Sequence, residues 1–135
     1  MRELHKVVVH YRDGALLRGH TRFFFHEQDR VEITDLEDVT HNVDLCKVKA
    51  VFFVREFSGD PDYGERKAFS QDSPVFGDSV RIVFSDGEML LGRAMGYRPE
   101  EKGFYLQPAD PKSNNRMVFV PAASLDRIEV GELKW

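Results

Sequence analysis

The sequence repeats itself at a nearly constant offset, and this repeat constrains the fold more than any other feature. The stretch VHYRDGALLRGH, residues 9–20, recurs as VFSDGEMLLGRA, residues 83–94. Both hold an Asp-Gly pair between apolar residues and a second glycine five positions after the first. Apolar positions further along match at a shift of 73 and then of 77. Two chance hairpins would not keep this order, so the chain is predicted to hold two related units.

The repeat divides the chain into three parts. We expect a first β unit at residues 1–54, a second β unit at residues 79–135 and a connecting segment at 55–78 that packs between them. The change of offset comes from a longer loop in the second copy, PADPKSNN at 108–115. A structureless connection as long as 55–78 is uncommon in a compact chain, so its aromatic residues should anchor it.

Each unit has the pattern of a small antiparallel sheet. Apolar residues alternate around the Asp-Gly pair, which is the strongest short hairpin signal in a sequence. Gly19 and Gly92 stand inside the second strand of each unit, where glycine usually marks a bulge, a sharp bend or a close backbone approach. No amphipathic helix longer than two turns is evident. Alternation predicts a core of Val7, Val9, Leu16, Val31, Ile33, Val51, Phe53, Val80, Ile82, Phe84, Leu90, Phe104, Leu106, Phe119, Leu125 and Ile128.

The segments YRDGALLRG and FSDGEMLLG resemble the Sm-like (LSm) small β-barrel family, which opens with an alternating strand, an Asp-Gly type turn and a bent second strand holding a glycine. The resemblance covers both units. It implies an all-β fold of two tandem Sm-like or SH3-like small β-barrel repeats packed as a pseudo-dimer. The stretches AVFFVREF and GFYLQPADPKSNNR also resemble an uncharacterised bacterial domain family found in signalling proteins, which implies no particular activity.

RNA binding, the activity that the Sm resemblance first suggests, is not carried over residue by residue. RNA-binding Sm proteins have an Asp and an Asn after the second strand and an Arg-Gly pair near the last strands. The corresponding segments at 23–33 and 96–106 lack the first pattern, and neither unit has Arg-Gly before its final strand. The net charge of -4 and the pI of about 5.7 also give little counterion release. We therefore expect no tight nucleic-acid binding and rank an RNA-binding Sm-like protein third.

The remaining composition predicts a cytoplasmic protein. The one cysteine, Cys46, allows no internal disulfide, which fits a reducing compartment. No apolar run approaches the roughly 20 residues of a membrane-spanning helix. The first ten residues have no long apolar stretch, so we expect neither a signal peptide nor a membrane partner.

The known catalytic and metal-binding patterns do not occur in the sequence, and we predict neither an enzyme nor a bound cofactor or metal. No P-loop, Gly-x-Ser-x-Gly or HExxH sequence is found. Of the five histidines, only His10 and His20 are expected near one another. Two histidines without a cysteine or a placed carboxylate are a weak zinc signal, so we interpret them as half-exposed strand residues.

The longer loop of the second unit is the main candidate for a binding site. Its prolines stiffen it, and its short polar side chains suit turns that leave backbone N–H groups facing an anion. Two cations add charge, while a purely structural, well-capped turn is the alternative interpretation. The candidate residues for a ligand or partner are Arg98, Asp110, Lys112, Ser113, Asn114, Asn115 and Arg116.

Two further surfaces are candidates. Arg18 and Arg22 have the spacing of one half of a cyclic-di-GMP-binding PilZ motif, but the other half is absent, so they are kept only as candidate anion contacts. The run Val51, Phe52, Phe53, Val54 lies inside an expected strand, and alternation would leave two of its side chains on the outer face. Such a strand is a candidate pairing edge, either with the other unit of the chain or between chains.

Two functions from different classes are open on this basis. The first is a non-enzymatic interaction or regulatory module that binds a protein partner or associates with itself. The second is a sensor that binds a nucleotide second messenger or another small anion between the units, through Arg18, Arg22, Lys112 and Arg116.

Overall fold

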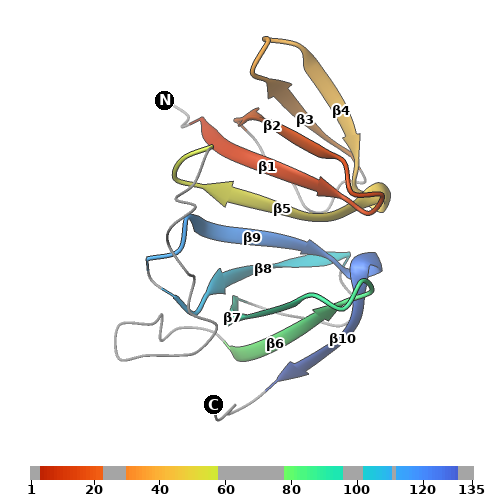
Figure 1. Ribbon diagram of the computed structural model, residues 1–135, viewed down its shortest axis with the longest axis vertical. Helices are drawn as coiled ribbons and strands as arrows, with labels where there is room; N and C mark the ends of the chain where they lie inside the picture. The colour runs from red at the N-terminus through yellow and green to blue at the C-terminus, as the bar shows by residue number, and fades with distance from the viewer. Residues whose placement is uncertain (1–3, 23–29, 58–77, 96–101, 111, 131–135) are drawn as a thin grey trace.

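The computed structural model describes residues 4–22, 30–57, 78–95, 102–110 and 112–130, and it is all-β (Figure 1). Most of the expected connecting segment, residues 58–77, lies outside these ranges. The first five strands are β1 (His5–Tyr11), β2 (Leu16–Thr21), β3 (Arg30–Asp35), β4 (Thr40–Asp44) and β5 (Val48–Val54), with the 3-10 turn η1 (Leu45–Lys47) before β5. The next five are β6 (Asp78–Phe84), β7 (Met89–Met95), β8 (Gly103–Pro108), β9 (Asn115–Pro121) and β10 (Leu125–Val130), with η2 (Ala122–Ser124) before β10.

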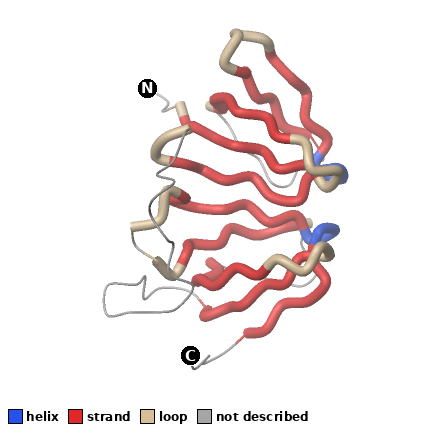
Figure 2. The backbone as a smooth tube through the Cα atoms, viewed as in Figure 1, coloured by secondary structure: helices blue, strands red, loops and turns tan. Residues whose placement is uncertain are grey.

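The ten strands of the described residues belong to one antiparallel sheet, in the order β10-β6-β7-β8-β9-β5-β1-β2-β3-β4. The first half therefore has the order β5-β1-β2-β3-β4 and the second half the matching order β10-β6-β7-β8-β9. Figure 2 shows η1 and η2 on the same side of the molecule, each leading into the last strand of its half. The all-β class is confirmed, while the pairing describes one continuous, open sheet rather than two closed barrels. The described part of the chain contains no helix that could cross a membrane.

The two Asp-Gly pairs form the predicted hairpin turns. Gly14 has a φ of 95° and Gly87 a φ of 93°, in the left-handed region that glycine adopts without strain. The preceding carboxylates fold back on the turn, because Asp13 Oδ1 accepts from the N–H of Ala15 at 2.9 Å and Asp86 makes the equivalent bond. The hairpin prediction is therefore confirmed for both β1–β2 and β6–β7.

Gly19 and Gly92 mark close backbone approaches, which is one of the three roles that their positions inside strands suggested. A Cβ atom on Gly19 would lie 2.2 Å from the carbonyl oxygen of Thr34, and one on Gly92 would lie 2.1 Å from that of Gln107. Only glycine lets the third strand of each half cross so near to the second.

The core consists of two clusters that share the central strands. Val51 and Phe53 of β5 pack in the first half, whereas Phe52 and Val54 pack in the second. From the other side, Phe119 of β9 enters the core of the first half. Both faces of β5 are therefore covered, which explains its unbroken apolar run.

The predicted core residues are buried or partly buried with one exception. Leu16 was expected inside, but 48% of its surface is exposed, so that prediction is wrong. Leu16 pairs with His10 beside the hairpin turn, and its neighbour Leu17 packs against the first-half cluster instead. The two residues stand on opposite faces of β2, and alternation alone did not tell which face is inner.

Candidate functional site

The β8–β9 loop holds itself in shape with its own polar side chains. Asp110 and Ser113 are buried, at 2% and 1% exposure. Asp110 Oδ1 accepts from the N–H of Lys112 at 2.9 Å, and Ser113 Oγ accepts from the N–H of Asn115 at 3.0 Å. These are the side-chain turns that the residue types favoured.

The same loop anchors the segment that leaves β5. Asn114 Oδ1 accepts from the N–H of Glu56 at 3.1 Å, and Asn114 Nδ2 donates to the carbonyl oxygen of Glu56 at 3.0 Å. Arg55 donates its N–H to the Asn114 carbonyl and its Nε–H to the Ser113 carbonyl. The loop thus ties the second half to the exit of the first, and sequence reasoning missed Arg55 and Glu56 as its partners.

The cations proposed for this loop have different positions. The side chains of Lys112 and Arg116 are exposed, so they are accessible to a ligand. Arg98 lies outside the described residues. The structure therefore brings the turn-forming residues together with Arg55 and does not test the grouping with Arg98.

Lys49 of β5 makes an ion-pair contact across the two halves. Its Nζ lies 2.6 Å from Asp86 Oδ2 and 2.6 Å from Glu88 Oε1, both at the β6–β7 turn, and 4.8 Å from the centre of the Phe84 ring. Burial alone would lower the pKa of Lys49, but its hydrogen bonds to the two carboxylates outweigh this and raise it. Ser124 Oγ donates to the Lys49 carbonyl at 2.7 Å. A cavity of about 220 Å³ beside this contact is lined by Arg12, Lys49, Phe84, Ser85, Asp86 and Ser124.

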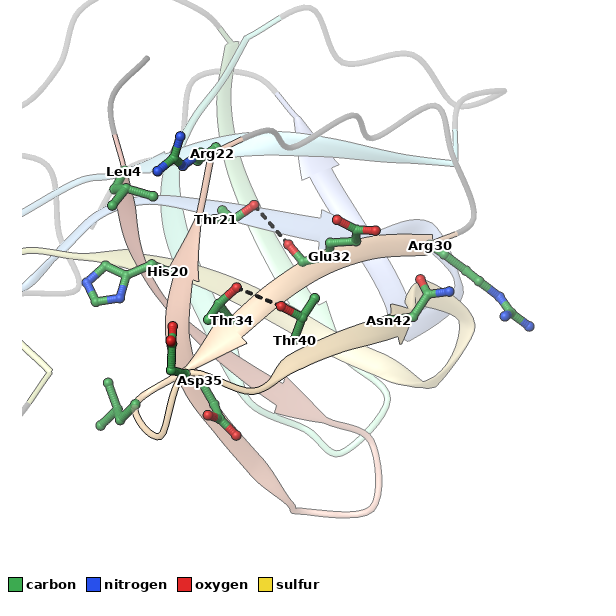
Figure 3. Close-up of a pocket in the computed structure, with 12 residues that line it drawn as sticks. Leu4, His20, Thr21, Arg22, Arg30, Glu32, Thr34, Asp35, Thr40 and Asn42 are labelled. Carbon is green, nitrogen blue, oxygen red and sulfur yellow. Dashed lines mark hydrogen bonds between the residues drawn. The ribbon is translucent and has the colours of Figure 1, made fainter. Parts of the chain in front are cut away.

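A second hollow, larger than the cavity beside Lys49, is an open trough on the first half with a volume of about 820 Å³ (Figure 3). It lies over β2, β3 and β4, where β2 and β3 keep only two paired positions. Thr34 and Thr40 share a hydrogen bond of 3.1 Å across its floor, and Thr21 donates to the Glu32 carbonyl at its upper side. The lining residues are Leu4, His20, Thr21, Arg22, Arg30, Glu32, Thr34, Asp35, Leu36, Asp38, Thr40 and Asn42.

The trough contains one of the two predicted anion contacts. Arg22 lines it together with Arg30, while Arg18 lies further along β2 and is not part of the lining. Both trough arginines belong to the first half, so they do not form a site between the units. Sequence reasoning missed Arg30, because nothing in the sequence indicated that β2 and β3 separate beside it.

One end of the trough is the β3–β4 turn. Asp35 Oδ2 lies 2.7 Å from His41 Nε2, and Asp35 also accepts from the N–H groups of Glu37 and Val39. The hydrogen bond with His41, followed by those from the backbone, holds the pKa of Asp35 below its usual value. Leu36 and Val39 are exposed at this turn, at 58% and 52%.

The predicted pairing edge at residues 51–54 and the two histidines of the first hairpin all lie on paired strands. Residues 51–54 pair with β9 inside the chain, with Val51 opposite Phe119 and Phe52 opposite Val118. His10 pairs with Leu16 and His20 with Lys6, so the two histidines do not face each other. Within the described ranges, no three His, Cys, Asp or Glu residues gather closely enough to hold a metal ion.

These features define an all-β domain of two similar halves, with a polar trough beside one outer strand. The chain belongs to a family of unknown function (DUF6982), which matches residues 3–131. Comparisons with curated proteins and with solved structures found no match.

Proposed function

We propose that this chain is a non-enzymatic interaction module of a bacterial cytoplasmic protein, which docks a protein partner along the outer edge of β4. In this proposal the two halves are tandem Sm-like units joined as a pseudo-dimer. The observation that carries the docking role is the position of β4, which ends the sheet and borders the trough.

The tandem arrangement is supported by the pairing register of each half. In the first half Val48 pairs with Tyr11, a bulge follows, and Ala50 pairs with His10. In the second half Leu125 pairs with Phe84, and Arg127 pairs with Val83 after a bulge at the same place. These residues correspond under the offsets of 77 and 73, so the sequence repeat is also a repeat of strand pairing.

The backbone of β4 supports docking by strand addition. Asp35 donates its N–H to the Val39 carbonyl at 2.8 Å, which makes this a hydrogen-bonded pair at the base of the turn. Along an antiparallel strand, the backbone N–H and C=O groups of successive residues point alternately toward the strand on one side and toward the other side. The main-chain groups of Thr40, Asn42 and Asp44 therefore point away from β3, toward the edge that no described strand covers. Such an edge is a template for an extended segment of a partner.

The test compares two variants at one position. Asn42→Pro removes an outward N–H without removing a bond to β3, whereas Asn42→Ala removes only the side chain. A photo-crosslinking residue at position 42 first identifies a partner in cells, with position 123 on η2 as the control site. The purified partner is expected to bind the wild type and Asn42→Ala and to lose binding to Asn42→Pro. Equal binding to all three would contradict docking on β4.

A second candidate function is a small-anion sensor, favoured by the presence of Arg22 and Arg30 in one trough. A ligand that binds only the folded state raises its melting temperature with ligand concentration. We expect such a rise with phosphate or a cyclic dinucleotide if the trough is the sensor site. It should be lost in the double variant Arg22→Ala, Arg30→Ala and kept in Arg18→Ala. A rise that survives the double variant would place the anion elsewhere.

A further inference from the structure

The chemistry of the partner that binds the β4 edge can be inferred by comparing this edge with the β5–β9 pairing that joins the two halves. The chain contains its own example of an edge junction, because β5 pairs with β9. At this junction Phe52 faces Val118 and Val51 faces Phe119, and all four side chains are buried. Apolar residues on both faces are therefore what this fold uses to join one unit to the next.

A second copy of the chain does not fit the outer edges in that way. The repeat offset makes β10 the equivalent of β5 and β4 the equivalent of β9, so a copy joined head to tail would pair β10 with β4. Glu129 would then lie opposite His41 and Ile128 opposite Asn42, at the positions where the internal junction has the apolar pairs Phe52–Val118 and Val51–Phe119. Covering Glu129 would remove solvent from a carboxylate that ion-pairs with Arg81 at 3.2 Å. Polar and charged side chains on an edge strand disfavour its pairing with an edge strand of another copy of the chain.

The charge of the β3–β4 hairpin indicates a different partner. Residues 30–44 hold one arginine and five carboxylates, a formal charge of -4 that equals the charge of the whole chain. The other 120 residues have no net formal charge, so the β3–β4 hairpin carries the excess of carboxylates of the chain, and it does so beside the open edge. A positively charged segment is attracted to this edge and an acidic one is repelled.

The side chains beside the edge add an apolar contribution. Leu4 and Leu36 both line the trough and are 50% and 58% exposed, and Val39 at the turn is 52% exposed. On the other face of β4, Val43 is buried in the first-half core at the rim of the sheet. An added strand would place alternate side chains on these two faces.

We propose that the β4 edge binds an extended basic segment of another polypeptide, in which basic and apolar residues alternate. This inference rests on the proposed docking function and names the chemistry of its partner. The main chain of the segment pairs with Thr40, Asn42 and Asp44. Its basic side chains lie on the trough face, toward the carboxylates of Glu32, Asp35 and Asp38, which outnumber the lining arginines Arg22 and Arg30. Its apolar side chains lie on the opposite face, at the rim beside Val43.

The probe is a short, fluorescently labelled peptide of alternating lysine and valine, with a Glu-Val peptide of the same length as control. Fluorescence anisotropy at low salt should detect binding of the basic peptide to the wild type and to Asn42→Ala. Binding should be roughly tenfold weaker to Asn42→Pro, because at least one main-chain hydrogen bond is lost. It should also weaken in Glu32→Gln and at raised salt, which screens the exposed charges.

Several results would overturn the inference. Equal binding of the basic peptide to wild type and Asn42→Pro would exclude the edge, and equal binding of the Glu-Val peptide would exclude the charge argument. A partner that crosslinks at position 42 while neither peptide binds would leave the docking function standing and refute the basic chemistry. Concentration-dependent dimers of the wild type that Asn42→Pro abolishes would make a second copy the occupant.

A folding defect in the proline variant would not prevent the test. Amide hydrogen exchange of the wild type reports on the same edge directly. The amides of Thr40, Asn42 and Asp44 should exchange more slowly when the basic peptide is added, and those of β7 should not change. Unchanged exchange at saturating peptide would refute pairing along β4.

Discussion

Gly92→Ala tests the closest backbone approach in the second half of the protein. An added Cβ would lie 2.1 Å from the carbonyl oxygen of Gln107, and Cβ atoms in proteins essentially never come within 3.0 Å of another atom. Strands β7 and β8 must therefore separate by about 0.9 Å at this point. That movement strains the adjacent bond from the Ala109 N–H to the Leu91 carbonyl, which is now 2.9 Å long.

The expected cost follows from these two effects. Overpacking against rigid backbone costs about 1–3 kcal/mol, and a weakened backbone hydrogen bond adds about 1 kcal/mol. We expect Gly92→Ala to lower the free energy of unfolding by about 3 kcal/mol, with a melting temperature lower by about 10 °C. Urea unfolding followed by far-UV circular dichroism measures this, and the slope with denaturant should stay unchanged.

Gly87→Ala is the matched control, because no atom lies within 4 Å of its added Cβ. Its cost is only that of a positive φ, about 1 kcal/mol. If Gly92→Ala proved no more destabilising than Gly87→Ala, the close approach of β7 and β8 would be refuted as the reason for glycine at position 92.

Three further predictions concern the junction and the edges. Lys49→Met should lower the free energy of unfolding by about 1 kcal/mol in urea titrations, since its partly exposed ion pairs are screened by solvent, and Lys47→Met should change little. The hydrogen bond from Lys49 lowers the pKa of Asp86. The contribution of this bond to the free energy of unfolding is therefore present at neutral pH and is lost as pH falls below about 4. In Lys49→Met, the free energy of unfolding should fall less steeply below this pH than in the wild type. An equally steep fall would contradict the assignment of this pH dependence to the Lys49–Asp86 contact. The double variant Glu129→Phe, His41→Val should form head-to-tail oligomers in analytical ultracentrifugation, whereas either change alone should leave the oligomeric state unaltered.

The hairpins and the close backbone approaches within each half were accessible from the sequence because they depend on local signals. Asp13-Gly14 and Asp86-Gly87 define the hairpins, and Gly19 and Gly92 mark the close approaches. These features act between residues that are near in the chain, so residue type and spacing are sufficient to predict them. The face chosen by Leu16 was predicted wrongly, because both Leu16 and Leu17 are apolar and only the packing distinguishes them.

The contacts between the halves were not accessible in the same way. An apolar run at Val51–Val54 shows that both faces are covered, but it does not show whether the cover comes from the same chain. Lys49 and Glu88 are 39 positions apart, and each alone looks like a solvated strand residue. The loop around Asn114 was singled out for its extra length, and the structure uses that length to bond Glu56, 58 positions away.

Differences between the two copies, rather than their likeness, determine which edges pair. Lys49 stabilises the internal junction by reaching Asp86, and the offset makes Asp126 the counterpart of Lys49 and Asp13 the counterpart of Asp86. A chain added head to tail would therefore bring two carboxylates together where the internal junction has an ion pair. Bringing like charges together at a covered edge costs free energy. This cost adds to that of covering the polar side chains of β4 and β10. We infer that pairing of this kind stops at the two halves of one chain, which under the proposed docking function leaves the edge of β4 to a partner of opposite charge.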